Sequence, residues 1–131
     1  MAKRKTALTF DTVRKIGLAL PDVEEATSYG VPALKVRGHM FTCIPTNKAA
    51  EPDSLVVRLS FEDRDALLAE APETYYLKEH YVDYPCVLVR LTRIDKDALA
   101  DLIKASWKFE IESRARRRPV KAKRRQRIES R

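Results

Sequence analysis

The chain has 131 residues, 44% hydrophobic and 34% charged, with two cysteines and a net charge of +7. This length is enough for one domain that buries a core without disulfides or a metal. No apolar run approaches the length of a membrane helix, and no apolar signal core follows the basic start MAKRKTAL. We therefore expect a cytoplasmic protein without membrane association, in which Cys43 and Cys86 are reduced, buried thiols.

The charge is distributed unevenly along the chain. Residues 114–131 hold ten Lys or Arg against one acid, Glu129, which is a net charge of +9. Because the whole chain carries +7, residues 1–113 carry −2. A run of like charges repels itself and cannot be buried. We expect a basic N-terminal arm over residues 1–8, one domain over residues 9–113 and a solvated basic tail over residues 114–131.

The first half of the chain reads as a helix followed by four strands. Apolar residues at helical spacing predict a helix over residues 10–19, with Thr9 as its N-cap and Pro21 beyond its end. Alternating or β-rich runs predict strands at 23–29, 33–37, 40–44 and 54–59. The second and third of these are separated by Gly38 and His39, which predicts a hairpin.

The second half reads as a helix, two strands and a long helix. Ser60 is a suitable N-cap for a helix that Pro72 ends, and strands are expected at 75–77 and 86–91. The last helix is expected to begin after Asp95 and to stop near Pro119. The order α-β-β-β-β-α-β-β-α predicts a two-layer α+β domain. Its antiparallel sheet of five to six strands has the helices packed on one face.

Positive side chains recur on the strand positions opposite the apolar ones. If the helices cover one face of the sheet, the other face would be open and basic, and able to contact phosphates. The competing interpretation is that exposed strands carry Lys and Arg for solubility. The candidates on and beside the strands are Lys35, Arg37, Arg58, Arg90 and Arg93.

The tail is a second candidate for binding polyanions. It contains no aromatic residue, so stacking on bases is not expected there. Its candidate residues are Arg114, Arg116, Arg117, Arg118, Lys121, Lys123, Arg124, Arg125 and Arg127.

An aromatic cluster suggests a different kind of site. Tyr75, His80, Tyr81 and Tyr84 are close in sequence and could line a ligand pocket, although such clusters more often serve packing. The two histidines and two cysteines lack the paired spacing of a zinc site, so no metal is expected. The sequence also lacks a phosphate-binding glycine loop and any nucleophile motif, so no catalytic residue is expected.

Three segments together resemble the MmcQ/YjbR family: EEATSYGVPALKVRGHMF, SFEDRDALLAEAPETYYLKEHYVDYPCVLVRL and DKDALADLIKASW. They include the Gly-Val-Pro-Ala turn, the Arg-Asp-Ala-Leu-Leu helix, the His-Tyr-x-x-Tyr-Pro link and the Leu-x-Arg-Leu strand. The resemblance covers roughly residues 10–107 and excludes the tail. It implies a frataxin-like (CyaY-like) fold and DNA binding, and it supplies no catalytic residue. The first helix and its following link contain too few acids to imply iron binding.

The sequence thus supports two hypotheses. The first is a non-enzymatic nucleic-acid-binding protein, for DNA rather than RNA, which uses the basic strand residues and the tail and needs no cofactor. The alternative is a protein-interaction or small-ligand module that uses the Tyr75–Tyr84 cluster, with the tail as an accessory arm. We assume a monomer in both cases.

Overall fold

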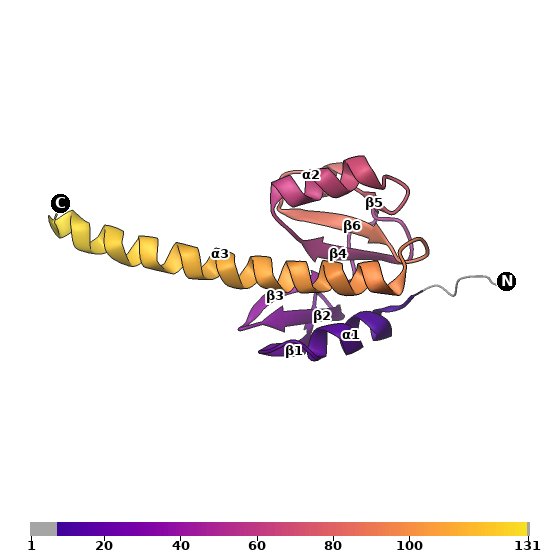
Figure 1. The fold of residues 1–131 in the computed structure, drawn as a ribbon, viewed down its shortest axis with the longest axis horizontal. Coiled ribbons are helices and arrows are strands. Elements are labelled where there is room, and N and C mark those ends of the chain that lie inside the picture. The colour runs from indigo at the N-terminus through magenta and orange to yellow at the C-terminus, as the bar shows by residue number, and fades with distance from the viewer. Residues whose placement is uncertain (1–7, 131) are drawn as a thin grey trace.

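The computed structural model describes the backbone of residues 8–130 and the side chains of residues 8–113. It confirms the expected order of elements and the two-layer α+β architecture (Figure 1). The elements are α1 (Phe10–Leu18), β1 (Val23–Ser28), β2 (Val31–Val36), β3 (His39–Cys43), β4 (Ser54–Arg58), α2 (Phe61–Glu70), β5 (Tyr75–Tyr76), the 3-10 helix η1 (Glu79–Tyr81), β6 (Cys86–Arg90) and α3 (Lys96–Ser130).

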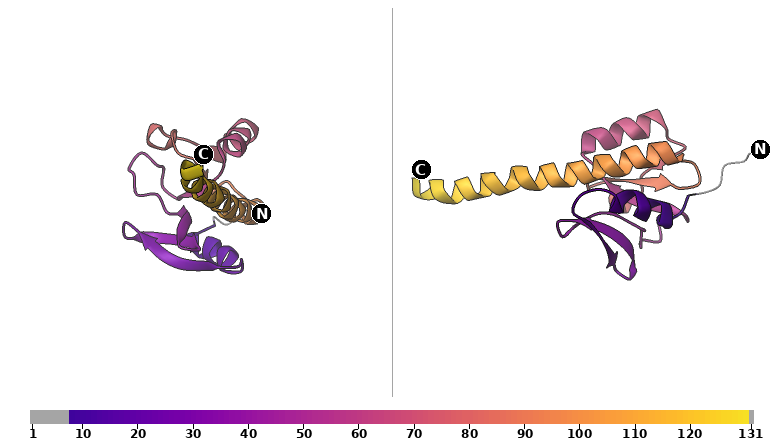
Figure 2. Two further views of the ribbon diagram at one scale, coloured as in Figure 1. Left: turned by 90° about the vertical axis from the view of Figure 1, so that its left-hand side faces the viewer. Right: turned by 60° about the horizontal axis from the view of Figure 1, so that its bottom comes forward.

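The six strands form one open antiparallel sheet in the order β1-β2-β3-β4-β6-β5. The ladder between β3 and β4 is short, with only Thr42↔Val57 and Cys43↔Val56 paired. Helix α3 packs across this central region, between α1 and α2 (Figure 2). There the buried Ser106 hydroxyl donates to the carbonyl of Phe41 at 3.0 Å. Phe41 is in neither register of β3, and this bond joins its carbonyl to α3.

The main core lies between the helices and the sheet. It contains Leu34, Phe41, Leu55, Leu99 and Ile103, which are all fully buried. The buried residues Leu99, Leu102 and Ile103 of α3 lie three and four positions apart, so one stripe of this helix faces the core. At Gly17 of α1, an added Cβ would collide with the side chain of Leu34, which explains a glycine inside a helix.

The alternation of the strands predicts that the opposite face of the sheet is open. The structure shows instead that this face is partly covered. It carries a second apolar cluster that includes Ala33, Cys43, Val56, Tyr76 and Leu88. The loop before β4 and the link between β5 and β6 cover part of this face. The buried Tyr81 belongs to that link, and the Tyr76 hydroxyl accepts from the Glu51 N–H at 2.8 Å. Long connections fold back over a sheet when they carry apolar side chains of their own, which strand alternation does not reveal.

The turn between β2 and β3 lies one residue earlier than expected. Its central residues are Arg37 and Gly38, with φ of 53° and 83°, and His39 already belongs to β3. Two-residue hairpin turns of the I′ type need positive φ at both central positions. Arg37 is therefore a turn residue and not a strand residue.

The end of the last helix also differs from the expectation. Helix α3 does not stop at Pro119 but continues to Ser130. A proline inside a helix removes one hydrogen bond and costs about 3 kcal/mol. Its neighbours are mostly Arg, Lys, Ala and Gln, which are good helix formers, and basic residues stabilise the negative end of the helix dipole.

Candidate nucleic-acid interface

The most strongly charged element is the C-terminal half of α3. This helix extends past the ends of the strands, and its distal part stands clear of the other elements in Figure 1 and in the right-hand view of Figure 2. Residues 114–130 span about 25 Å at the usual helical rise of about 1.5 Å per residue. Nine of the ten basic residues of the tail lie on this helical stretch, although their side chains and Arg131 are outside the described residues.

Arg90 is held by several groups of the body. Its Nε and Nη2 donate to the two carboxylate oxygens of Glu51, each at 2.8 Å, and its guanidinium lies 4.3 Å from the centre of the Tyr76 ring. Its Nη1 donates to the carbonyls of Pro72 and Glu73 at 3.1 Å. The hydrogen bond from Arg90 lowers the pKa of Glu51 below its ordinary value. The same bond raises the pKa of Arg90.

Arg58 and Arg37 also have carboxylate partners. The Nε of Arg58 donates to Glu110 of α3 at 3.0 Å, and the Glu110 side chain is only 2% exposed. The Nε of Arg37 donates to Asp22 at 3.1 Å. Because an ion pair offsets the charge that a phosphate would meet, three of the five strand candidates are already neutralised in part.

Lys35 and Arg93 differ from those three. Among the described residues, neither has an ion pair within 4.0 Å, and Arg93 is exposed. Lys35 lies on β2 and Arg93 follows β6, with β3 and β4 between them. Arg58 and Arg90 lie at opposite ends of the β4–β6 ladder. The structure therefore does not bring the five candidates together in one patch.

A hollow of about 290 Å³ lies on the side of the sheet that α3 does not cover. Three of the four aromatic-cluster candidates line it: His80, Tyr81 and Tyr84. The His80 ring contacts Tyr81 edge to face, with 4.8 Å between centroids, and lies 6.3 Å from Tyr84. Tyr75 lies elsewhere, in the core between sheet and helices. Successive residues of a strand point to opposite faces, so Tyr76 and not Tyr75 belongs to the hollow's side of the sheet.

Buried thiols form part of the floor of this hollow. Cys43 and Cys86 are both free and both line it. Burial raises the pKa of Cys43 to about 11, with a smaller contribution from Cys86. Burial likewise raises the pKa of Cys86, and it raises the pKa of Tyr81. These groups stay neutral at physiological pH, so the floor is uncharged.

The residue that holds the rim of the hollow in place begins the Arg-Asp-Ala-Leu-Leu motif, but nothing in the sequence indicated this role. Arg64 of α2 is 8% exposed, and its Nη1 donates to the carbonyls of Val82 at 2.9 Å and Tyr84 at 3.1 Å. Its guanidinium lies 4.7 Å from the centre of the Phe61 ring. An arginine in the middle of a polar helix is ordinarily read as a solvated residue, so its role depends on tertiary contacts.

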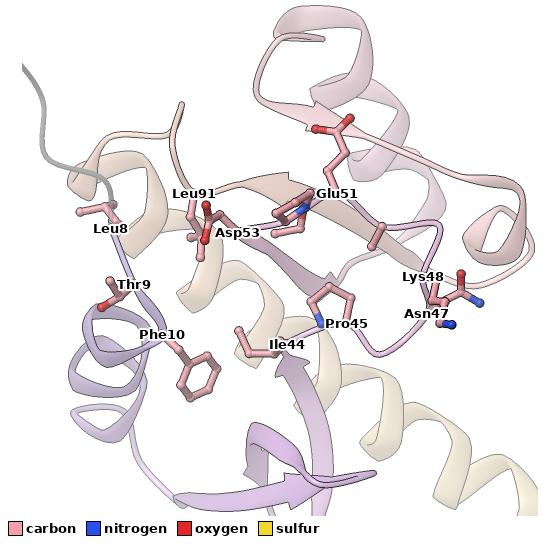
Figure 3. A pocket seen from close by; sticks show the side chains of 13 residues that line it. Leu8, Thr9, Phe10, Ile44, Pro45, Asn47, Lys48, Glu51, Asp53 and Leu91 are labelled. Carbon is pink, nitrogen blue, oxygen red and sulfur yellow. The ribbon is translucent and has the colours of Figure 1, made fainter.

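A larger hollow, of about 520 Å³, lies where the N-terminal segment meets the loop between β3 and β4. Figure 3 shows Leu8 and Phe10 on one side and Asn47 and Lys48 on the other, with Asp53 beside Leu91. Charges of both signs occur around it, so it does not have the uniform positive lining that a polyanion site requires.

Comparisons with known proteins agree with this fold. The YjbR family model matches residues 18–109. Uncharacterized proteins of Mycobacterium bovis and Mycobacterium tuberculosis are 39% identical over 66 residues, which covers 47% of this chain and 51% of each relative. The chain thus spans about half the length of these relatives. A crystal structure of a Deinococcus radiodurans protein with a DUF419 domain superposes with a TM-score of 0.62 at 21% identity, over 76% of this chain and 75% of that one.

Proposed function

The chain belongs to the YjbR family, and from this premise we propose that it is a non-enzymatic protein that binds nucleic acid, DNA rather than RNA. The distal half of α3 would be the main phosphate-contacting element. The choice of DNA follows the family resemblance of the domain, whereas the charge argument applies to any polyanion.

The observation that carries the proposal is the +9 net charge of residues 114–131, most of it on a helix that stands clear of the body. Over about 25 Å this is roughly one net positive charge every 3 Å. Duplex DNA carries one negative charge about every 1.7 Å of its axis. A helix of this charge density displaces counterions when it lies along a groove or backbone, and the released ions drive binding without sequence preference.

The folded body would contribute less. Residues 1–113 carry −2, and Lys3, Arg4 and Lys5 belong to the N-terminal arm, so the domain over residues 9–113 carries −5. Arg37, Arg58 and Arg90 have carboxylate partners. Of the five strand candidates, Lys35 and Arg93 are the two without an ion pair, and each would add one phosphate contact. Basic groups paired with protein carboxylates gain little from a phosphate, because one partner must be given up for the other.

The test is a salt titration of binding, measured by fluorescence anisotropy with duplex DNA and duplex RNA. If six or more phosphates are contacted, the affinity of the full chain should fall by about 10³-fold or more between about 50 and 200 mM salt. Tighter binding to DNA than to RNA would support the choice of DNA. An affinity that does not depend on salt would contradict the proposal.

The aromatic hollow supports a second candidate, a small-ligand module. Three of the four residues expected for it line one hollow. On this view a chain ending at Ser113 would bind its ligand as well as the full chain does. It would also show no salt-sensitive binding to DNA.

A further inference from the structure

The 290 Å³ hollow has features that its role in packing does not explain. Two of its lining residues are among the most exposed large side chains in the described part of the molecule: Tyr29 is 92% exposed and Tyr84 is 55% exposed. The floor beneath them is buried and uncharged, and includes Val56, Cys43 and Cys86. Exposed aromatic rings at the edge of an apolar floor can stack on a ring from outside the protein.

Tyr29 is held there by an uncommon backbone conformation. It forms the turn between β1 and β2 with Gly30, and the two residues have φ of 53° and 82°. Asn, Asp or Gly is the usual choice in such a turn, and a bulky residue with positive φ is an outlier. Here the conformation presents the tyrosine ring almost entirely to solvent, so local packing does not compensate for the strain. Strain of this kind is found at ligand contacts.

Tyr84 is exposed but its backbone is anchored. Arg64 holds the carbonyls of Tyr84 and Val82, and the Tyr84 N–H donates to the carbonyl of Tyr81 at 3.1 Å. When a partner stacks on such a ring, only the two side-chain torsions lose freedom, because the backbone is already fixed. The backbone on the Tyr84 side of the rim is therefore preorganised for a planar partner.

The size of the hollow limits that partner. Sites for small molecules usually occupy about 300–1,000 Å³, so this one has room for a single flat ring system and little more. Its lining includes His80, which supplies ring nitrogens, and Arg58, which supplies N–H donors. A planar heteroaromatic ring with polar edges matches this combination.

The hollow also adjoins the basic helix. Arg58 lines the hollow, and its Nε contacts Glu110 of α3 at 3.0 Å. Arg114, where the basic stretch begins, is four residues further, or about 6 Å along the helix axis. A strand with its phosphates along the basic stretch of α3 would pass close to the opening.

We propose that the hollow binds one unpaired nucleobase, stacked against Tyr84 and Tyr29, of a strand whose phosphates contact the basic stretch of α3. This inference rests on the proposed function and adds a base-recognising site to it. A free nucleotide has the same ring chemistry. The experiment therefore distinguishes a base within a strand from the base of a free nucleotide.

The experiment compares two single strands that differ only in their bases. The full chain is titrated by anisotropy, at about 0.1 M salt, with labelled oligothymidylate of about twelve nucleotides and with an abasic strand of the same length. Both strands have the same phosphates. We expect oligothymidylate to bind at least about five-fold more tightly, because stacking of one base contributes a factor of this size.

Variants then locate the effect. Tyr84→Ala and Tyr29→Asn should each bring the ratio of the two affinities close to one, while affinity for the abasic strand stays unchanged. Asn adopts positive φ readily, so Tyr29→Asn should not harm the turn. Val82→Ala is the matched control, since Val82 is in the same link and 44% exposed but does not line the hollow. It should leave the ratio unchanged.

The outcomes separate this inference from the proposed function. Equal, salt-sensitive binding of both strands would overturn the base site and leave the proposed function intact, whereas failure of both strands and of duplex DNA would overturn both. Thymidine monophosphate is titrated in parallel. If the monophosphate binds much more weakly than oligothymidylate, the hollow takes a base that belongs to a strand. Equal affinity of the two would overturn the link to nucleic acid.

Discussion

The arginines of the body and those of the distal helix α3 are alike in sequence but differ in their surroundings. In the body, Arg37, Arg58, Arg64 and Arg90 each have a carboxylate partner, a carbonyl partner or both. Residues 114–131, by contrast, contain ten basic residues and a single acid. The number of positive residues is therefore a poor guide to where a polyanion binds, and the ratio of positive to negative groups nearby is a better one.

The largest effect expected from this comparison is the loss of binding without the tail. A chain ending at Ser113 should bind duplex DNA about 100-fold or more weakly than the full chain at about 50 mM salt, because most phosphate contacts are removed. Its thermal unfolding midpoint should change little, since the core of the body ends before the deleted residues. Anisotropy and circular dichroism measure the two properties.

A matched variant separates charge from length. Replacing six of the tail Lys and Arg residues by Gln keeps a helix-forming segment of the same length but removes most of its charge. It should reproduce the loss of affinity. Full retention of binding by this variant would show that the body holds the phosphates, and the comparison above would fail.

Arg64→Met should have the largest effect on stability among the body arginines. It removes charge-assisted hydrogen bonds to the carbonyls of Val82 and Tyr84 in a nearly buried setting. The free energy of unfolding, measured with urea, should fall by about 2–3 kcal/mol. Arg93→Met, at an exposed position, is the control and should change it by less than about 0.5 kcal/mol. Similar values for both variants would mean that Arg64 is not a structural anchor.

Arg90→Met should destabilise the body less, by about 1–2 kcal/mol, because it removes the contact with the Tyr76 ring and the bonds to Pro72 and Glu73. DNA affinity should stay within about two-fold, since Arg90 is engaged inside the body. A large loss of DNA binding in a folded Arg90→Met protein would restore the basic sheet face as the site.

The ion pair between Arg90 and Glu51 predicts that the stability of the folded protein depends on pH. The pKa of Glu51 is lowered in the folded protein, so its contribution to stability is fully present above its unfolded-state pKa. That contribution is lost as the pH falls below about 4.3 and through the folded-state pKa. Wild type and Glu51→Gln should therefore differ in urea stability at neutral pH and converge in acid. A difference that persists below both pKa values would rule out the carboxylate as its cause.

The smallest effect is expected at Lys35 and Arg93, the two strand candidates without ion pairs. Lys35→Gln and Arg93→Gln should each weaken DNA binding by only a few fold and reduce the slope of log affinity against log salt by less than about one. Arg37→Gln, whose residue is paired with Asp22, is the matched control. If neither substitution changes the affinity for DNA, the sheet is not part of the interface.

Much of the fold could be predicted, because it follows from local patterns. Ser60 caps α2 through a bond from the Asp63 N–H, and Asp95 caps α3 through a bond from the Ala98 N–H, as the sequence indicates. The two-residue turn at Arg37 was misplaced by one position, because the sequence motif does not specify which residues take positive φ.

The candidate sites were predicted less well. The aromatic cluster was identified, but with Tyr75 in place of Tyr29, which is distant in sequence and reaches the hollow from another turn. The resemblance to the YjbR family identified the domain without indicating any site within it.

The order of the elements, the strand and helix faces that form the main core, and the concentration of positive charge at one end all follow from the sequence alone. These properties depend on residues within a few positions of one another. Only the tertiary structure decided which arginines are neutralised, which tyrosines share the hollow, and that Arg58 joins this hollow to α3 through Glu110. The bond between Arg58 and Glu110, for example, joins residues 52 positions apart in the chain. They depend on how the sheet and its connections fold together, which no local pattern encodes.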